Sequence, residues 1–133
     1  MTICIVQAAL IASLAAPGFS LSWTHSVEKT TWTEEWRIEG DRLKAVSASV
    51  EGSGAGIDVP DGAKMTPKGW IYQPSLPPLP ELVLGSSGAT GSGWRLCTSE
   101  TCLDIGEDEG QPVQIFVSGD GRSCEEQAAG RNR

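Results

Sequence analysis

The stretch FSLSWTHSVEKTTWTEEWRI, residues 19–38, decides the fold prediction. Apolar and polar side chains alternate on both sides of a central polar segment, EKTT at 28–31. Alternation with a period of two is typical of β-strands that bury one face. A polar connection of this length suits a hairpin. The stretch therefore predicts two antiparallel strands, over 19–27 and 32–38, with a hairpin loop at 28–31.

This hairpin loop implies a register in which four pairs of side chains face each other: Val27 and Trp32, His25 and Glu34, Trp23 and Trp36, and Leu21 and Ile38. His25 and Glu34 are then the only polar pair on an apolar face, where each needs a partner. Two interpretations stay open. The pair fixes the strand register, or it is a recognition or proton-sensing dyad in a pocket rimmed by Trp23 and Trp36.

Short alternating segments continue along the rest of the chain, separated by turns among its 16 Gly and 8 Pro residues. We expect about eight or nine short strands and no long helix. This pattern predicts an all-β fold, either a small antiparallel β-sandwich or a partly open barrel. Residues 1–119 are expected to form a single β domain, and residues 120–133 a flexible tail. Further strands are expected at 42–50, 70–74, 81–84 and 112–119, with a tight hairpin within 93–106.

The N-terminal stretch MTICIVQAALIASLAAPGFS (1–20) has two interpretations. Its apolar run and small residues fit a short secretory signal. The alternative is two core strands, at 2–7 and about 10–15, which the absence of a preceding Lys or Arg and the interruption at Gln7 favour. The run is too short and broken for a membrane span, so we expect no stable membrane insertion. A signal segment, or oxidised cysteines, would place the protein in the periplasm, and otherwise the cytoplasm is expected.

The four cysteines fit two disulfides, for which three connectivities exist, or four reduced thiols. A zinc site is disfavoured, because four residues separate Cys97 from Cys102 and no second close pair follows. A hairpin through TSET would place Cys97 opposite Cys102, within disulfide range. By elimination, Cys4 would then neighbour Cys124.

The charge balance limits the possible partners. Ten basic residues against 17 acidic ones give a net charge of −7. Neutralising phosphate requires clustered Lys and Arg, so nucleic acid is not an expected partner, and neither is an anionic membrane surface.

Two loop segments carry further expectations. The Gly-rich segment at 51–69 can adopt positive φ at Gly52, Gly54 and Gly56 and form an anion-binding concavity of backbone N–H groups. We expect it to lie near His25 and to help wall a shallow pocket. The PPLP segment at 77–80 fits either a ligand of proline-reading domains or, in a compact β protein, a cap on a strand edge.

Catalysis and metal binding find little support in the sequence. His25 and Ser26 are adjacent on a strand, so their side chains point to opposite faces and cannot form a direct pair. GSGAG (52–56) is neither a nucleophile elbow nor a dinucleotide fingerprint. A single His with nearby Glu residues offers few metal ligands. The sequence therefore predicts a binding module that is not an enzyme and needs no cofactor, with these candidate binding residues: Trp23, His25, Ser26, Glu28, Glu34, Trp36, Gly54 and Gly56.

Four segments taken in order also resemble an uncharacterised bacterial family, domain of unknown function 1850: FSLSWTHSVEKTTWTEEWRI (19–38), GSGAGIDVPDGA (52–63), GWIYQPSLPPLPELVLG (69–85) and GWRLC (93–97). The resemblance implies a small β domain with no established catalytic activity. It also implies an accessory role beside TRAP transporters of the TAXI type, which move solutes across the inner membrane, with a transporter subunit as partner. The alternative is a small-molecule or ion binder that uses the His25 hairpin and the Gly-rich loop. A hydrolase is the third possibility.

Overall fold

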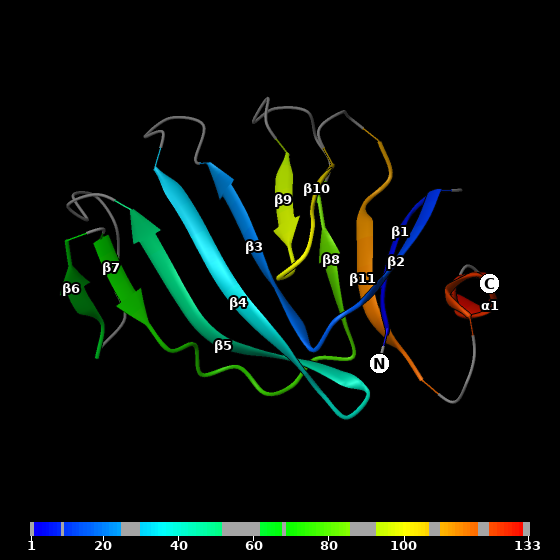
Figure 1. The fold of residues 1–133 in the computed structure, drawn as a ribbon, viewed down its shortest axis with the longest axis horizontal. Coiled ribbons are helices and arrows are strands. Elements are labelled where there is room, and N and C mark those ends of the chain that lie inside the picture. Colours follow the sequence, from blue (N-terminus) through cyan, green and yellow to red (C-terminus); the bar gives the residue numbers. More distant parts are fainter. Residues whose placement is uncertain are drawn as a thin grey trace.

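A computed structural model shows two antiparallel β-sheets and one short helix (Figure 1). It describes residues 2–8, 10–24, 30–51, 62–67, 69–85, 93–106, 110–119 and 123–131. The elements are β1 (Thr2–Gln7), β2 (Leu10–Ala15), β3 (Gly18–Thr24), β4 (Thr31–Glu39), β5 (Arg42–Glu51), β6 (Lys64–Thr66), β7 (Gly69–Tyr72), β8 (Glu81–Leu84), β9 (Trp94–Cys97), β10 (Cys102–Ile105), β11 (Val113–Ser118) and α1 (Cys124–Arg131).

The strands form a small sheet in the order β2-β1-β11-β8 and a large sheet in the order β10-β9-β3-β4-β5-β7-β6. The predicted all-β class is confirmed, and the arrangement is a sandwich of two sheets rather than a closed barrel. The described part of the chain contains eleven strands, more than the eight or nine expected. One of the additional strands is β6, which lies within the Gly-rich segment that was expected to be irregular.

The main core fills the space between the two sheets. The small sheet contributes apolar residues from β1, β8 and β11, and the large sheet contributes them from β3, β4, β5 and β9. Period-two alternation explains this arrangement, because it sends every second side chain of a strand to the same face. The fully buried members include Ile3, Leu21, Leu43, Leu96 and Ile115.

A second, smaller cluster covers the opposite face of the small sheet. There α1 packs on β1 and β11 through Cys4, Val6, Phe116, Cys124 and Ala128. A disulfide joins Cys4 to Cys124 with their Cα atoms 5.5 Å apart, as the sequence predicted. Residues 124–131 thus form a packed helix, whereas a flexible tail was expected over 120–133.

The start of α1 is capped in the usual way. The backbone N–H of Glu126 donates to Ser123 Oγ over 3.2 Å, which satisfies one of the unpaired donors of the first turn. Glu125 and Glu126 place negative charge at the positive end of the helix dipole. These local interactions, together with the disulfide, explain why so short a helix forms here.

Both N-terminal strands expected from the sequence are present, but only β1 is a core strand, because β2 lies at the edge of the small sheet and none of its residues is fully buried. β1 lies inside the small sheet between β2 and β11, and its residues 3–6 are buried. Within the described ranges, no helix has the length and apolar character needed to cross a membrane.

The proline-rich segment between β7 and β8 closes the edge of β5. Leu43 and Leu79 exchange backbone hydrogen bonds of 2.8 Å in both directions. Lys44 Nζ also donates to the Leu76 carbonyl over 2.6 Å. β7 pairs with β5 only along Ala48–Glu51, so the segment covers the first half of β5, where an edge would otherwise be open. This geometry favours the edge-cap interpretation of PPLP.

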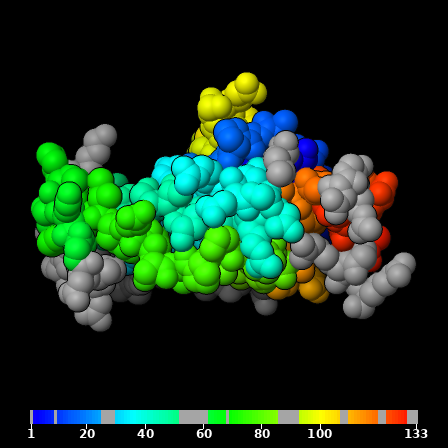
Figure 2. Space-filling view, turned by 90° about the horizontal axis from the view of Figure 1, so that it is seen from below, coloured from blue at the N-terminus to red at the C-terminus, as the bar shows by residue number. Residues whose placement is uncertain are grey.

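The large sheet extends beyond the small one. In Figure 1 the strands of the small sheet lie toward the right, whereas β7 and β6 lie at the far left, past the small sheet's edge. Figure 2 shows the same elongated arrangement from below, with β6 and β7 (green) at one end and α1 (red) at the other. Part of the inner face of the large sheet is therefore not opposed by the small sheet.

Candidate functional site

The register of the β3–β4 hairpin differs from the predicted one by four residues. Trp23 pairs with Trp32, Leu21 with Glu34, and Phe19 with Trp36. The predicted pairings of His25 with Glu34, Trp23 with Trp36, Val27 with Trp32 and Leu21 with Ile38 are therefore wrong. β3 ends at Thr24 and β4 begins at Thr31, where the pairing of the two strands starts. A shift by an even number of residues keeps every side chain on its face, so alternation alone cannot distinguish the two registers.

Several sequence-predicted site residues lie outside the described residues: His25, Ser26, Glu28, Gly54 and Gly56. The proposed closeness of the Gly-rich loop to His25 therefore stays a prediction. Trp23, Glu34 and Trp36 are described, and all three belong to the inner face of the large sheet.

A row of tryptophans crosses this inner face near one end of the strands. Trp23 on β3 lies opposite Trp32 on β4, which lies opposite Val50 on β5, which lies opposite Trp70 on β7. On the other side, the Trp94 ring of β9 lies 4.9 Å from that of Trp23, tilted by 55°. We call Trp94, Trp23, Trp32 and Trp70 the aromatic strip. All four residues are half-buried, so each keeps part of its surface exposed.

The strip is held in place by ring contacts and by one hydrogen bond. The rings of Trp23 and Trp32 are stacked, with centroids 6.3 Å apart. Trp94 Nε1–H donates to the carbonyl of Gly85, just after β8, over 3.0 Å. This bond ties the strip to the edge of the small sheet.

A carboxylate lies in the next row of the same face. Glu34 on β4 has Leu21 on one side and Ala48 on the other, and Ala48 pairs in turn with Tyr72 on β7. Trp36 Nε1–H donates to Glu34 Oε1 over 3.2 Å. Glu34 therefore lies two residues from Trp32, one member of the strip, and is oriented by another tryptophan.

The electrostatics of Glu34 follow from this apolar setting. Burial raises the pKa of the Glu34 carboxyl above its ordinary value, and the Trp36 hydrogen bond opposes the shift in part. Burial also raises the pKa of the Tyr72 phenol, and the nearby Glu34 charge adds to that increase. The Glu34 and Tyr72 side chains thus interact electrostatically across the small side chain of Ala48. Among the described residues, no Lys or Arg forms an ion pair with Glu34.

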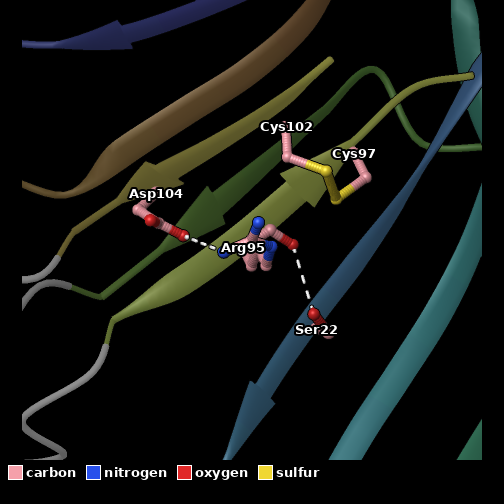
Figure 3. Close-up of polar contacts among 5 residues, drawn as sticks. All are labelled: Ser22, Arg95, Cys97, Cys102 and Asp104. Atoms are coloured by element: carbon pink, nitrogen blue, oxygen red, sulfur yellow. Dashed lines mark hydrogen bonds and ion pairs between the residues drawn. A yellow bond between two sulfur atoms is a disulfide. The ribbon is translucent and has the colours of Figure 1, made fainter. Parts of the chain in front are cut away.

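The outer face of the large sheet is different in character (Figure 3). Arg95 on β9 pairs with Asp104 on β10 over 3.3 Å, and both side chains are exposed. Ser22 Oγ donates to the Arg95 carbonyl over 3.5 Å. Beside them the predicted Cys97–Cys102 disulfide joins β9 to β10, with the Cα atoms 4.1 Å apart. Both cysteine pairs are thus oxidised, which excludes the reduced and zinc-bound alternatives for this structure.

Two open depressions mark this outer face. One of about 300 Å³ is lined by Ser22, Thr24, Thr31 and the Arg95–Asp104 pair. The other, of about 440 Å³, runs past Ser20, Glu35 and Cys97. Across the described ranges, no three His, Cys, Asp or Glu side chains form a group suited to a metal ion.

Sequence reasoning missed four residues of the inner-face site: Trp32, Trp70, Tyr72 and Trp94. Trp32 was paired with Val27 in the predicted register, whereas it lies opposite Trp23. Trp70 and Trp94 each follow a glycine at the start of a short strand, in GWIY and GWRL. That repeated Gly-Trp pair was the available signal, but only the pairing of distant strands places the two tryptophans in one row.

Comparison with known proteins gives one match. A family model described as "Domain of unknown function (DUF1850)" matches residues 19–105. The matched range runs from β3 to β10, so it contains every strand of the large sheet and β8 of the small one. No curated protein and no solved structure matches the chain.

Proposed function

Since the chain belongs to the DUF1850 family, for which no function is described, we propose a role from the site itself: a non-enzymatic binding module that acts as an accessory to a solute transporter of the TAXI-type TRAP class. The aromatic strip is its binding surface, and a transporter subunit is its partner.

One observation carries the binding role. Four half-buried tryptophans form one row on a sheet face that extends past the small sheet, with a carboxylate in the adjacent row. Apolar rings with few polar groups are the typical lining of binding sites, and tryptophan is the residue most enriched at energetically important contacts. Such side chains bind and orient a partner, which is the basis for proposing a module without catalysis.

Two arguments support the transporter link. The motifs of residues 19–38 and 69–85 resemble a family associated with TAXI-type TRAP transporters. The two disulfides are compatible with the oxidising periplasm, one of the two compartments that an inner-membrane transporter faces.

The test is co-purification with the TAXI-type transporter subunits encoded in the same genome. The wild-type chain is expected to retain a subunit, and Trp70→Ala to release it. Ile71→Ala is the matched control, because Ile71 is the next residue of β7, is 44% exposed and points to the opposite face. Equal retention by the two variants, or no subunit retained by the wild type, would contradict the proposal.

A second candidate function is small-molecule binding without a transporter partner. The position of Glu34 favours it, because a carboxylate on an aromatic face can fix the orientation of a small ligand. A solute-dependent rise in melting temperature that Glu34→Gln abolishes, in a protein that retains no transporter subunit, would support this alternative.

A further inference from the structure

We propose that Glu34 and the aromatic strip together bind an organic ammonium ion, a small cation with an apolar body. This inference rests on the proposed use of the strip as a binding surface and adds the chemical class of the ligand. The apolar body would lie on the tryptophan rings, and the positive charge would lie next to the Glu34 carboxylate.

The arrangement along β4 supplies both interactions that such a cation needs. Trp32, Glu34 and Trp36 occupy alternate positions, so their side chains share one face at intervals of about 6.7 Å. Tryptophan has the ring that attracts cations most strongly, through the negative potential over its face. The hydrogen bond from Trp36 Nε1 holds one carboxylate oxygen, Oε1, and leaves Oε2 for the ligand.

Tyr72 on β7 lies beyond Glu34, on the side of the site away from β3. Glu34 and Tyr72 lie on strands separated only by β5, so their backbones are about 9.6 Å apart. Ala48, between them, projects only a methyl group. Tyr72 therefore lies on the same face as Glu34 and close enough for the Glu34 charge to raise the pKa of its phenol.

Charge complementarity favours a cation over an anion or a neutral ligand. The chain carries a net charge of −7, and in the described part of the structure no basic side chain pairs with Glu34. Burial raises the pKa of the Glu34 carboxyl because its charged form is desolvated. A bound ammonium ion would stabilise the carboxylate form, whereas a bound anion would repel it.

Choline and its uncharged isostere 3,3-dimethylbutan-1-ol are the probes for the experiment. The two molecules have the same shape and differ in charge. Tryptophan fluorescence of the full chain is followed during titration with each probe. We expect a saturable change with choline, and at least about tenfold weaker binding of the neutral isostere because it lacks the cation–π and charge interactions.

Three variants locate the binding. Glu34→Gln keeps an oxygen for the Trp36 hydrogen bond but removes the charge, and we expect about tenfold weaker choline binding. Trp32→Phe keeps an aromatic ring of weaker potential, and about 2- to 10-fold weaker binding is expected. Glu35→Gln removes an equal charge from the adjacent residue, which points to the other face, and should leave choline binding unchanged.

The outcomes separate this inference from the proposed function. Equal affinity for the two probes, no saturable response to choline, or Glu34→Gln and Glu35→Gln variants that bind choline alike would each overturn the ammonium assignment. Co-purification with a transporter subunit would stand in all three cases. Conversely, choline binding that depends on Glu34, without any retained subunit, would support the ammonium site and overturn the transporter role.

Discussion

Trp23 and Trp32 lie directly opposite each other on β3 and β4, and their rings are stacked with planes only 10° apart. This pair sets the register of the hairpin from which the strip extends to both sides. The contribution of the Trp23–Trp32 contact to the free energy of unfolding therefore measures how rigidly the aromatic strip is held before it binds a partner.

Replacing either tryptophan with alanine should lower the free energy of unfolding by about 2–3 kcal/mol, less than for a fully buried ring because both are half-buried. The double variant should reveal a coupling of about 0.5–1.5 kcal/mol from the stacked contact. Urea denaturation followed by circular dichroism gives these values. Trp23→Ala with Trp70→Ala is the control, since two strands lie between β3 and β7, and their effects should add. Equal coupling in both cycles would show that the stacked contact contributes nothing specific.

Glu34 should make the protein less stable as the pH rises. Its folded-state pKa lies above the ordinary value of 4.5, so the folded state holds a proton that the unfolded state has already released. Stability is then lost as the pH rises from the unfolded value through the folded one. Glu34→Gln removes this loss, so the stability of the variant relative to wild type should increase as the pH rises from the ordinary carboxyl pKa through the higher folded-state pKa of Glu34. Denaturation midpoints measured across this range provide the test.

The control for this titration is Glu35→Gln. Burial raises the pKa of Glu35 as well, but its side chain is exposed, so we expect a change of the same sign and smaller size. A larger change for Glu35 than for Glu34 would contradict the assignment of Glu34 to the inner face.

The two disulfides should differ in their effect on stability. The Cys4–Cys124 bond spans 120 residues and the Cys97–Cys102 bond only 5. In the chain-entropy account, removing the first costs about 5 kcal/mol and removing the second about 2 kcal/mol. Denaturation of the double alanine variant of each pair tests this order. Loss of the long-range bond should also reduce the helical signal of α1, which the short-range variant should retain.

Gly69→Ala should be strongly destabilising. Gly69 begins β7 with a φ of 133°, and a methyl group there would overlap the Val50 carbonyl oxygen. Backbone strain and this overlap together should cost about 2–4 kcal/mol. Gly85→Ala is the matched control, because nothing lies within 4 Å of the added methyl group. Similar thermal midpoints for the two variants would mean that β7 is not held against β5 as described.

Local alternation predicted individual strands well but not how distant strands meet. The expected strands at 2–7 and 81–84 coincide with β1 and β8, because each has a clear apolar pattern between turns. The hairpin register was wrong because alternation fixes only the face of each residue, and the loop length decides the rest. The aromatic strip could not be predicted without the β5–β7 and β3–β9 pairings, which join segments that are far apart in the sequence.

The helix α1 could not be predicted for a different reason. Its sequence CEEQAAGR has few apolar residues and is too short to form a stable helix alone. Packing of Cys124 and Ala128 on the small sheet stabilises it, together with the bond to Cys4. The residues that stabilise α1 therefore belong to β1, at the opposite end of the chain, and to β11.

The pairing of Cys4 with Cys124 also constrains oxidative folding. Until Cys4 has paired with Cys124, Cys97 and Cys102 are available as wrong partners. The β9–β10 hairpin holds Cys97 opposite Cys102, and closing so short a loop takes well under a microsecond, whereas disulfide formation takes seconds or longer. Oxidation of Cys97 with Cys102 is therefore favoured over a wrong bond to Cys4 or Cys124. The β9–β10 hairpin thereby favours correct formation of the Cys4–Cys124 bond, although it takes no part in that bond.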